Sequence, residues 1–389
     1  MRIIQADYIF PLNQAPIKKG YLFIEDDGTV IHVSEIAPIT DDFEVEKYAG
    51  FICPGFVNTH CHLELSHLKG LIPEAAGLEK FLDQIPKMRD LPQANPSQSM
   101  RDADKEMYAA GIVAVGDISN TTAGLEVKKK SPLLYHSFVE VFGLDAGKSE
   151  ALLSEGKKVL EAYLANNQSA SLVPHAPYSV SPELLEGVYR HDKKSLKSIH
   201  HQESKAENQL FLDGEGGFIT LFEEKGVDIS RIKKMGISSS QYSILKHLSK
   251  DEKILLVHNT YSTQEDINFI EHNLNNAYWC SCPKSNWFID RQLPDYELWR
   301  KNKLKITLGT DSLASNCGLS ILEEMKCIQE NFPQISTNEL LIWACKNGAE
   351  FLSFPKLGSF SAGFNPGILL IKNTQGTSLT KESCIEVLC

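Results

Sequence analysis

Two histidines, His60 and His62, flank one cysteine directly after the segment Pro54-Gly55-Phe56-Val57-Asn58-Thr59. Side chains at positions i and i+2 of a strand point to the same face, so both imidazoles can reach one ion about 2.0 to 2.1 Å from each nitrogen. The chain has 12 histidines in 389 residues. About a third of one such pair is therefore expected by chance. The pair predicts a metal site because of its position at the end of a strand.

Four other residues that can bind a metal or move a proton each follow a different predicted strand. They are His175 in HAPYS, His200 in HHQES, His258 in VHNTYS and Asp311 in LGTDS. In an α/β barrel, the carboxyl ends of the strands assemble the active site from distant parts of the sequence. A histidine without such a position is more often a hydrogen-bonded core or surface residue, which is our interpretation of His32, His136, His191, His247 and His272.

The middle of the chain carries the elements that must position these residues. From Phe51 to about Phe354, short apolar runs alternate with helix-period segments, as is typical of βα units with a parallel sheet. The eight predicted strands cover 55–59, 112–117, 133–141, 170–173, 198–200, 254–258, 277–280 and 305–309. Predicted helices include 100–110, 149–165, 182–190, 239–247 and 264–273, the last with Thr263 as its N-cap. Eight such units predict a closed (β/α)8 TIM barrel of roughly 250 residues.

The two ends of the chain have a different pattern. Residues 2–33 contain short alternating strands, with a hairpin signal at Asp26-Asp27-Gly28, and such strands are not expected to form a parallel sheet. Turn residues at 357–367 precede a strand-like run at 368–371. Two stretches with weak patterning, 63–97 and 204–238, are predicted to be functional loops that overhang the catalytic face.

Composition excludes several classes of protein. The formal net charge is −11, and the longest basic run is Lys128, Lys129 and Lys130. This balance argues against nucleic acid and anionic membrane surfaces as partners. No apolar run reaches the roughly 18 residues of a membrane span, and the N-terminus lacks a signal-peptide pattern, so we expect a cytoplasmic protein. The sequence leaves open whether the protein is a homo-oligomer.

The cysteine spacing argues against a structural zinc site, and the absence of glycine-rich motifs argues against a nucleotide-binding loop. The nine cysteines are scattered without CxxC spacing. In a reducing compartment we interpret most of them as small buried hydrophobic residues. Cys280 and Cys282 have no second pair nearby with which to complete a structural zinc site. Neither a GxxxxGK[ST] loop nor a strand-linked GxGxxG motif is present, so triphosphate and dinucleotide chemistry lacks a binding loop.

The motifs taken together resemble a known family. PGFVNTHCHLE, LVPHAPYS, IHHQES, VHNTYS, CPKSN and LGTDSLASN occur in the order found in the amidohydrolase superfamily. The similarity is to the branch with cytosine, guanine, S-adenosylhomocysteine and aminodeoxyfutalosine deaminases and chlorotriazine-type hydrolases. It implies a small β-sandwich built from residues 1–52 and 354–389, and a metal-dependent hydrolase barrel over residues 53–353. NPG stands where many relatives have an acidic-Ala-Asp triplet, at the start of a structural strand.

The resemblance also implies a role for each site residue. The ligands of one divalent ion, zinc in the first place with iron as the alternative, would be His60, His62, His200 and Asp311. Glu203 would shuttle protons, and His258 would hold the attacking water. His175 would contact the substrate, with Glu64 and Ser315 as further candidates. For Glu64, an ordinary loop role is an equal alternative. His201 competes with His200, but the HxxE spacing favours His200. Because no lysine ends the fourth strand, a binuclear site bridged by a carbamylated lysine is disfavoured.

The chemistry of these groups predicts a hydrolytic deaminase. Three neutral imidazoles and a carboxylate leave an open coordination position, and the ion lowers the pKa of a bound water towards about 7. Glu203 can carry a proton to the ring and then to departing ammonia, Asp311 can accept the water's proton, and His258 can stabilise developing charge. The small-molecule substrate would be an aminated purine-like heterocycle.

The substrate itself is narrowed by resemblance alone. The CHLELSHL segment is similar to aminodeoxyfutalosine deaminases of menaquinone biosynthesis. The alternatives in the same branch are deaminases of guanine, S-adenosylhomocysteine or methylthioadenosine, and a chlorohydrolase. An alternative from a different functional class is a non-catalytic protein, in which the metal-binding barrel serves as a binding subunit. That interpretation requires an incomplete set of site residues, and none of the expected residues is missing.

Overall fold

The computed structural model describes residues 1–38, 44–89, 95–244 and 248–389. Each of the eight strands predicted for the middle of the chain is present. They are β6 (Phe56–Cys61), β7 (Ile112–Ser119), β8 (Leu134–Val141), β9 (Ser169–Pro174), β10 (Lys197–His201), β11 (Lys253–His258), β12 (Asn276–Ser281) and β13 (Lys305–Leu308). Most of their residues are buried, as expected for strands covered on both faces.

These strands form two parallel sheets of four, in the orders β6-β7-β8-β9 and β10-β11-β12-β13. Backbone hydrogen bonds link the two sheets at both seams. The His200 N–H donates to the His175 carbonyl at 2.8 Å, and the Thr310 and Asp311 N–H groups each donate to the His60 carbonyl at 3.1 Å. The predicted α/β class is confirmed, and the two seams bring residues from the first, fourth, fifth and eighth strands together.

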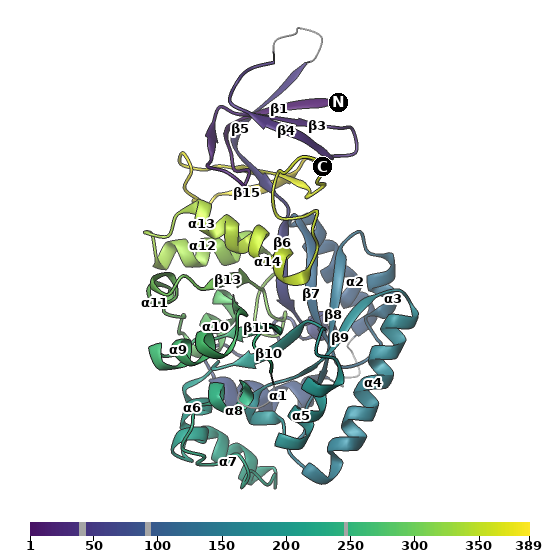
Figure 1. Ribbon diagram of the computed structural model, residues 1–389, viewed down its shortest axis with the longest axis vertical. Helices are drawn as coiled ribbons and strands as arrows, with labels where there is room; N and C mark the ends of the chain where they lie inside the picture. The colour runs from purple at the N-terminus through teal and green to yellow at the C-terminus, as the bar shows by residue number, and fades with distance from the viewer. Residues whose placement is uncertain (39–43, 90–94, 245–247) are drawn as a thin grey trace.

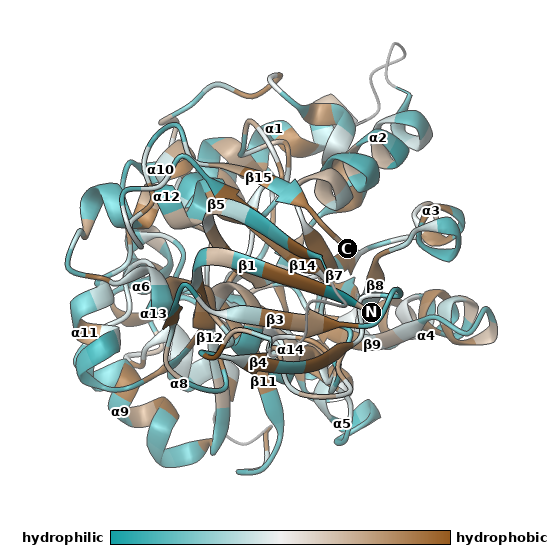
Figure 2. Ribbon diagram, turned by 90° about the horizontal axis from the view of Figure 1, so that it is seen from above, coloured by the Kyte–Doolittle hydropathy of each residue, from teal (hydrophilic) through white to brown (hydrophobic). Residues whose placement is uncertain are grey.

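The helices lie around the outside of these sheets (Figure 2). Helices α4 (Ser149–Ala165) and α9 (Gln264–Asn273) have the predicted bounds, and Thr263 caps α9 in a capping box with Asp266. Helix α2 (Pro96–Ala109) begins earlier than predicted because Asn95 caps it ahead of Pro96. Helix α8 (Ser239–Ile244) covers the start of the predicted 239–247 helix, and residues 245–247 lie outside the described residues. The other helices of the middle region are α3 (Leu125–Lys130), α5 (Pro182–His191), α10 (Pro283–Asp290), α11 (Tyr296–Lys301), α12 (Ile321–Asn331), α13 (Thr337–Leu341) and α14 (Asn347–Leu352).

The weakly patterned stretches are not plain loops. The first contains η1 (Leu63–Leu68) and α1 (Leu78–Arg89), and the second contains α6 (Lys205–Leu212) and α7 (Gly217–Glu224). The prediction of loops was wrong, because both stretches contain helices, and apolar side chains of α1 and α7 line a cavity. They lie at the end of the molecule away from the terminal strands (Figure 1).

Strands from both ends of the chain form one mixed sheet in the order β15-β14-β5-β1-β3-β4, with β2 paired to β1. Its strands are β1 (Arg2–Ile9), β2 (Ile17–Lys18), β3 (Tyr21–Ile24), β4 (Val30–Ser34), β5 (Val45–Pro54), β14 (Ile368–Lys372) and β15 (Cys384–Val387). The predicted turn at Asp26-Asp27-Gly28 joins the antiparallel strands β3 and β4. The strands within residues 2–33 pair with one another in antiparallel fashion, as expected. The other edge of β1 pairs in parallel with β5, which lies outside that stretch.

The core lies between the sheets and the surrounding helices. Its largest cluster includes Trp279, Tyr296, Trp299 and Met325, all essentially inaccessible to solvent. All nine cysteines are free thiols, and five of them are buried, in line with the predicted role as small apolar residues. Within the described ranges, no helix has both the length and the apolar character needed to cross a bilayer.

A buried ion pair supports the segment that follows His62. The Lys128 ammonium lies 2.6 Å from Asp117 Oδ2, and both side chains are fully buried. Lys128 also donates to the hydroxyls of Ser119 and Ser137, at 2.8 Å each. Asp117 Oδ1 accepts the Leu63 N–H at 2.7 Å. The pair therefore fixes the backbone directly after the two-histidine motif.

Replacing Lys128 with Met is expected to destabilise the fold by about 3–5 kcal/mol, because it leaves the Asp117 charge buried without its partner. The matched control is Lys130→Met on the same helix, whose side chain is 81% exposed and whose loss should change stability by about 0.5 kcal/mol or less. Urea unfolding of both variants measures the difference. Equal unfolding midpoints would contradict a supporting role for the Lys128 and Asp117 pair.

Candidate metal and substrate site

Four donor atoms from three separate parts of the chain converge at the carboxyl ends of the strands. His62 Nε2 lies 3.1 Å from His60 Nε2 and 3.2 Å from His200 Nε2. Asp311 Oδ1 lies 3.5 Å from His60 Nε2 and 3.3 Å from His62 Nε2. His60 lies on β6 and His62 directly follows its last residue, Cys61, so the two side chains point to one side as alternate residues of an extended chain do. His200 is the second-last residue of β10, and Asp311 follows β13.

The spacing of these atoms fits a single metal ion. Four ligands at 2.0 to 2.2 Å in a tetrahedron are about 3.3 to 3.6 Å from one another. The observed separations of 3.1 to 3.5 Å match that value closely. Three imidazoles and one carboxylate are donors that suit zinc or iron. His60, His62, His200 and Asp311 could therefore hold one divalent ion.

Neighbouring groups orient two of these ligand candidates. The Nδ1 atom of His200 lies 2.9 Å from the His175 carbonyl oxygen. A carbonyl oxygen can only accept, so Nδ1 must donate, and the Nε2 lone pair then faces the cluster. Asp311 Oδ2 accepts from the hydroxyls of Ser285 and Ser315 at 2.6 Å each. These two hydrogen bonds leave Asp311 Oδ1 directed at the imidazoles.

Burial keeps the imidazoles of His62, His175, His200 and His258 neutral. It lowers the pKa of His62 to about 3, and the nearby Asp311 carboxylate offsets this only in part. Burial also lowers the pKa of His175 and of His258 to about 4, and that of His200 well below its ordinary value. Burial alone would raise the pKa of Asp311, but its hydrogen bond with His60 and the other imidazoles hold that pKa well below its ordinary value. At neutral pH His62 and His200 are thus neutral nitrogen donors beside the Asp311 anion.

Glu203 and His258 lie beside the cluster and face each other. His258 Nε2 is 3.6 Å from Glu203 Oε1. His258 Nδ1 lies 2.8 Å from the carbonyl oxygen of the Asn286 side chain, so Nδ1 donates there and fixes the ring. Burial raises the pKa of Glu203 well above its ordinary value, and the nearby carboxylates Asp311 and Glu207 raise it further. A carboxyl group whose protonated form is favoured in this way can both give and take a proton.

A cavity of about 530 Å³ opens onto these groups. Its reactive end is lined by His62, His175, His200, Glu203, His258 and Asp311. Its other end is lined mainly by apolar side chains of α1 and α7, namely Leu78, Phe81, Leu82, Ile85, Pro86, Phe218, Leu221 and Phe222. An ion pair of 2.8 Å between Lys225 and Asp83 links these two helices. A cavity that combines convergent polar groups with an apolar wall is typical of a small-molecule site.

Three residues that the sequence offered as site candidates do not line the cavity. The Glu64 carboxylate accepts the Thr121 N–H at 3.1 Å and its hydroxyl at 2.8 Å, which matches the loop role left open for it. Ser315 lies behind Asp311 rather than in front of it. The ring of His201 faces the opposite side from His200, where it hydrogen-bonds Asn259 and Ser240. The alternation of side chains along β10 separates the two adjacent histidines.

Glu140 and Asn120 are among the polar residues of the cavity wall that were not predicted. Glu140 lies on β8 with its carboxylate 3.5 Å from His200 Nδ1. Asn120 follows β7, and its amide donates to Glu140 Oε2 at 3.1 Å. Both follow the same rule as the predicted residues, since each lies near the carboxyl end of a strand. Neither belongs to a local motif that could have singled it out.

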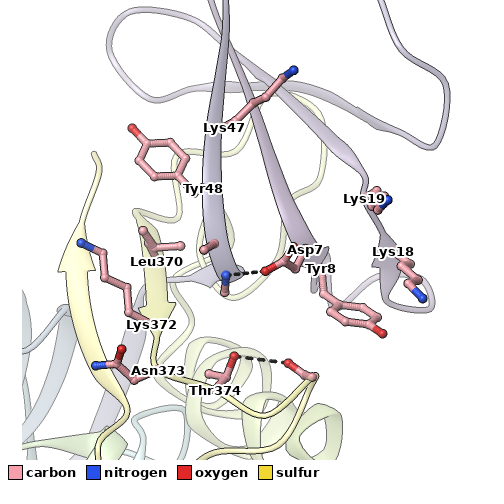
Figure 3. A pocket seen from close by; sticks show the side chains of 13 residues that line it. Asp7, Tyr8, Lys18, Lys19, Lys47, Tyr48, Leu370, Lys372, Asn373 and Thr374 are labelled. Carbon is pink, nitrogen blue, oxygen red and sulfur yellow. Dashed lines mark hydrogen bonds between the residues drawn. The ribbon is translucent and has the colours of Figure 1, made fainter.

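A second cavity, of about 670 Å³, lies on the terminal sheet and differs in kind from the first. Its wall includes Lys18, Lys19, Lys47 and Lys372. Figure 3 shows that these side chains extend in different directions and do not converge on one point. The convergent donor set of the first cavity therefore makes it the functional-site candidate.

Comparisons with known proteins agree with this geometry. A model of the amidohydrolase family matches residues 51–386. An adenosine deaminase of Helicobacter pylori is 26% identical over 362 residues, covering 90% of this chain and 87% of that protein. An aminodeoxyfutalosine deaminase of Nitratiruptor sp. is 26% identical over 349 residues, covering 87% of this chain and 82% of that protein.

A solved structure shows the same fold. The crystal structure of Helicobacter pylori aminofutalosine deaminase in complex with methylthio-coformycin superposes with a TM-score of 0.83 at 23% identity. The superposition covers 98% of this chain and 94% of that chain. Together with the family model, which spans nearly the whole sequence, these matches lead to one conclusion. The chain belongs to the amidohydrolase family of hydrolytic enzymes.

Proposed function

We propose that the protein is a metal-dependent deaminase that hydrolyses the exocyclic carbon–nitrogen bond of an aminated purine-like heterocycle and releases ammonia. The observation that carries this proposal is the convergence of four donor atoms, in which His62 Nε2 lies 3.1 to 3.3 Å from atoms of His60, His200 and Asp311. Three of these residues line one cavity together with Glu203. The deaminase activities named for the two relatives support it.

We assign His60, His62, His200 and Asp311 as the ligands of one divalent ion, zinc by preference. When bound, the ion would lower the pKa of a water molecule in the cavity towards about 7. Glu203 Oε1 delivers a proton to the ring nitrogen and then to the departing amino group. In the overall reaction a carbon–oxygen bond forms, the exocyclic carbon–nitrogen bond breaks, and the two protons of the attacking water end on the ring nitrogen and on the ammonia that leaves.

The other roles follow from position. Asp311 Oδ1 accepts a proton from the attacking water, and the lone pair of neutral His258 Nε2 accepts a hydrogen bond from that water, because Nδ1 donates to Asn286. His175 lies on the cavity wall, where its ring can contact the heterocycle. We propose only an indirect role in substrate binding for Glu64 and Ser315. Neither side chain lines the cavity, because each hydrogen-bonds a protein group, Thr121 and Asp311 respectively.

We also propose that the two four-stranded sheets form one closed (β/α)8 barrel over residues 53–353. The hydrogen bonds at the two seams support closure. The remaining residues, 1–52 and 354–389, would form the small β-sandwich domain. The mixed sheet that joins β5 to β14 supports the assignment of both termini to one unit.

For the substrate, we propose aminodeoxyfutalosine, which would place the enzyme in menaquinone biosynthesis. The names of the Nitratiruptor relative and of the Helicobacter structure support this choice. Adenosine, methylthioadenosine, S-adenosylhomocysteine and guanine are the alternatives within the same chemistry.

Ammonia release from a panel of compounds tests the proposal. The zinc-loaded protein would be assayed with aminodeoxyfutalosine, adenosine, methylthioadenosine, S-adenosylhomocysteine, guanine and a chlorotriazine. We expect release from the adenine nucleosides, with the highest kcat/KM for aminodeoxyfutalosine. Chloride release without ammonia release would reject deamination, and no turnover of any compound would favour a binding subunit.

A further inference from the structure

A buried carboxylate outside the cavity connects two segments that both contact Asp311. Glu324 lies on α12, and its side chain is inaccessible to solvent. One of its oxygens accepts the Lys284 N–H at 2.9 Å. The other accepts the side-chain amide of Asn316 at 2.8 Å. Glu324 thus holds the first turn of α10 and the loop after β13 at a fixed separation.

Each of these two segments supplies a hydroxyl to the same carboxylate oxygen. Ser285, next to Lys284, and Ser315, next to Asn316, both donate to Asp311 Oδ2 at 2.6 Å. The Asn316 amide also donates to the Thr310 carbonyl at 2.9 Å, which fixes the peptide that leads into Asp311. Asp311 is therefore held from its side chain and from its backbone, and both sets of contacts lead back to Glu324.

The backbone of Asp311 needs such support. Its φ angle is +56°, in the left-handed region that a residue with a side chain rarely adopts. Residues in this region keep their conformation when the surrounding structure fixes them, and they cluster at functional sites. If the two segments separated, Asp311 Oδ1 would no longer be aimed at the three imidazoles.

We propose that Glu324 is a positioning residue that aims Asp311 at the metal cluster. The inference rests on the proposed function, because it takes Asp311 as a metal ligand. A carboxylate suits this position because both of its partners are N–H donors, and each of its oxygens accepts one of them. Lys284 and Asn316 belong to the CPKSN and LGTDSLASN motifs, so Glu324 joins two motifs that are separate in the sequence.

The test compares Glu324→Gln with Glu323→Gln. Glutamine keeps the size of Glu324 but offers one oxygen, so one of the two buried N–H donors loses its acceptor. Glu323 is the neighbour on the same helix, is partly exposed and pairs with Lys326. We expect Glu324→Gln to raise the Zn²⁺ dissociation constant 10- to 100-fold, the usual range for partners of metal ligands. Glu323→Gln should bind Zn²⁺ as the wild type does.

Two further readouts separate positioning from simple support of the fold. The absorption spectrum of Co²⁺-loaded protein should change in Glu324→Gln, because the spectrum depends on ligand geometry. With a substrate identified by the ammonia assay, kcat should fall and KM should stay unchanged. A Glu324→Gln protein with a lower melting temperature but wild-type Zn²⁺ affinity and Co²⁺ spectrum would overturn the inference.

Asn316→Ser provides a second route if Glu324→Gln does not fold. This change removes the link from Glu324 to the Thr310 peptide and leaves the Lys284 contact in place. We expect weaker Zn²⁺ binding in the same direction, and wild-type affinity would overturn the inference. If the wild type and both variants bind Zn²⁺ equally well, the positioning role of Glu324 is rejected and the metal site is not. Wild-type protein that binds no Zn²⁺ rejects the metal site and the role of Glu324 together.

Discussion

Glu203→Gln is expected to lower kcat by roughly 10³-fold or more, because one group serves both proton transfers and each such transfer is typically worth about 10² to 10⁴ in rate. Glutamine keeps the size and hydrogen-bonding shape of the side chain but carries no transferable proton. Since Glu203 lies beside the donor cluster and is not one of its four converging atoms, metal content should stay near that of the wild type. Metal analysis and steady-state kinetics of the same preparation measure both quantities.

The control for this prediction is Lys205→Met. A structural alternative is that Glu203 serves only to pair with a nearby lysine such as Lys205. The structure instead places the Glu203 carboxylate 3.6 Å from His258. Lys205→Met should therefore leave kcat close to the wild-type value. A Glu203→Gln protein with full metal occupancy and nearly normal kcat would rule out the proposed proton shuttle, whatever the substrate is.

Much of the cluster could be predicted because its members obey local rules. His60 and His62 share one face of a strand by the alternation of side chains. The same alternation explains why only one of the adjacent residues His200 and His201 faces the cluster, and the spacing to Glu203 indicates which one. Asp311 could be placed because the carboxyl ends of parallel strands gather at one end of the fold. In each case the sequence carries the information within a few residues.

The cavity wall could not be predicted in the same way. Glu140 and Asn120 lie near the ends of β8 and β7, but nothing nearby in the sequence distinguishes them from other polar residues at strand ends. Helices α1 and α7 direct apolar side chains into the cavity, so their patterns differ from that of a helix packed on a sheet. The partners of α1 also lie far away in the sequence, as the ion pair between Asp83 and Lys225 shows.

The partners of the buried ionic groups could not be predicted from the local sequence either. Lys128 stands in a basic run that indicates a solvated face, yet its ammonium is buried against Asp117. Glu324 and Glu323 are neighbours with the same side chain, but one is buried and the other is partly exposed. Helical periodicity predicts that such neighbours differ in burial. It does not identify the two N–H donors from α10 and the loop after β13 that make a buried carboxylate tolerable.

The most direct measurement of the central claim is ammonia release as zinc is returned to chelator-treated protein. We predict that metal-free wild-type protein releases no ammonia from its substrate, and that activity rises linearly to a plateau at one equivalent of Zn²⁺, because three imidazoles and one carboxylate suit a single ion. His62→Ala should neither retain the ion nor recover activity, whereas His272→Ala, at an exposed position, should behave as the wild type. Full activity without metal, or a plateau only at two equivalents bound at the site, would contradict the account.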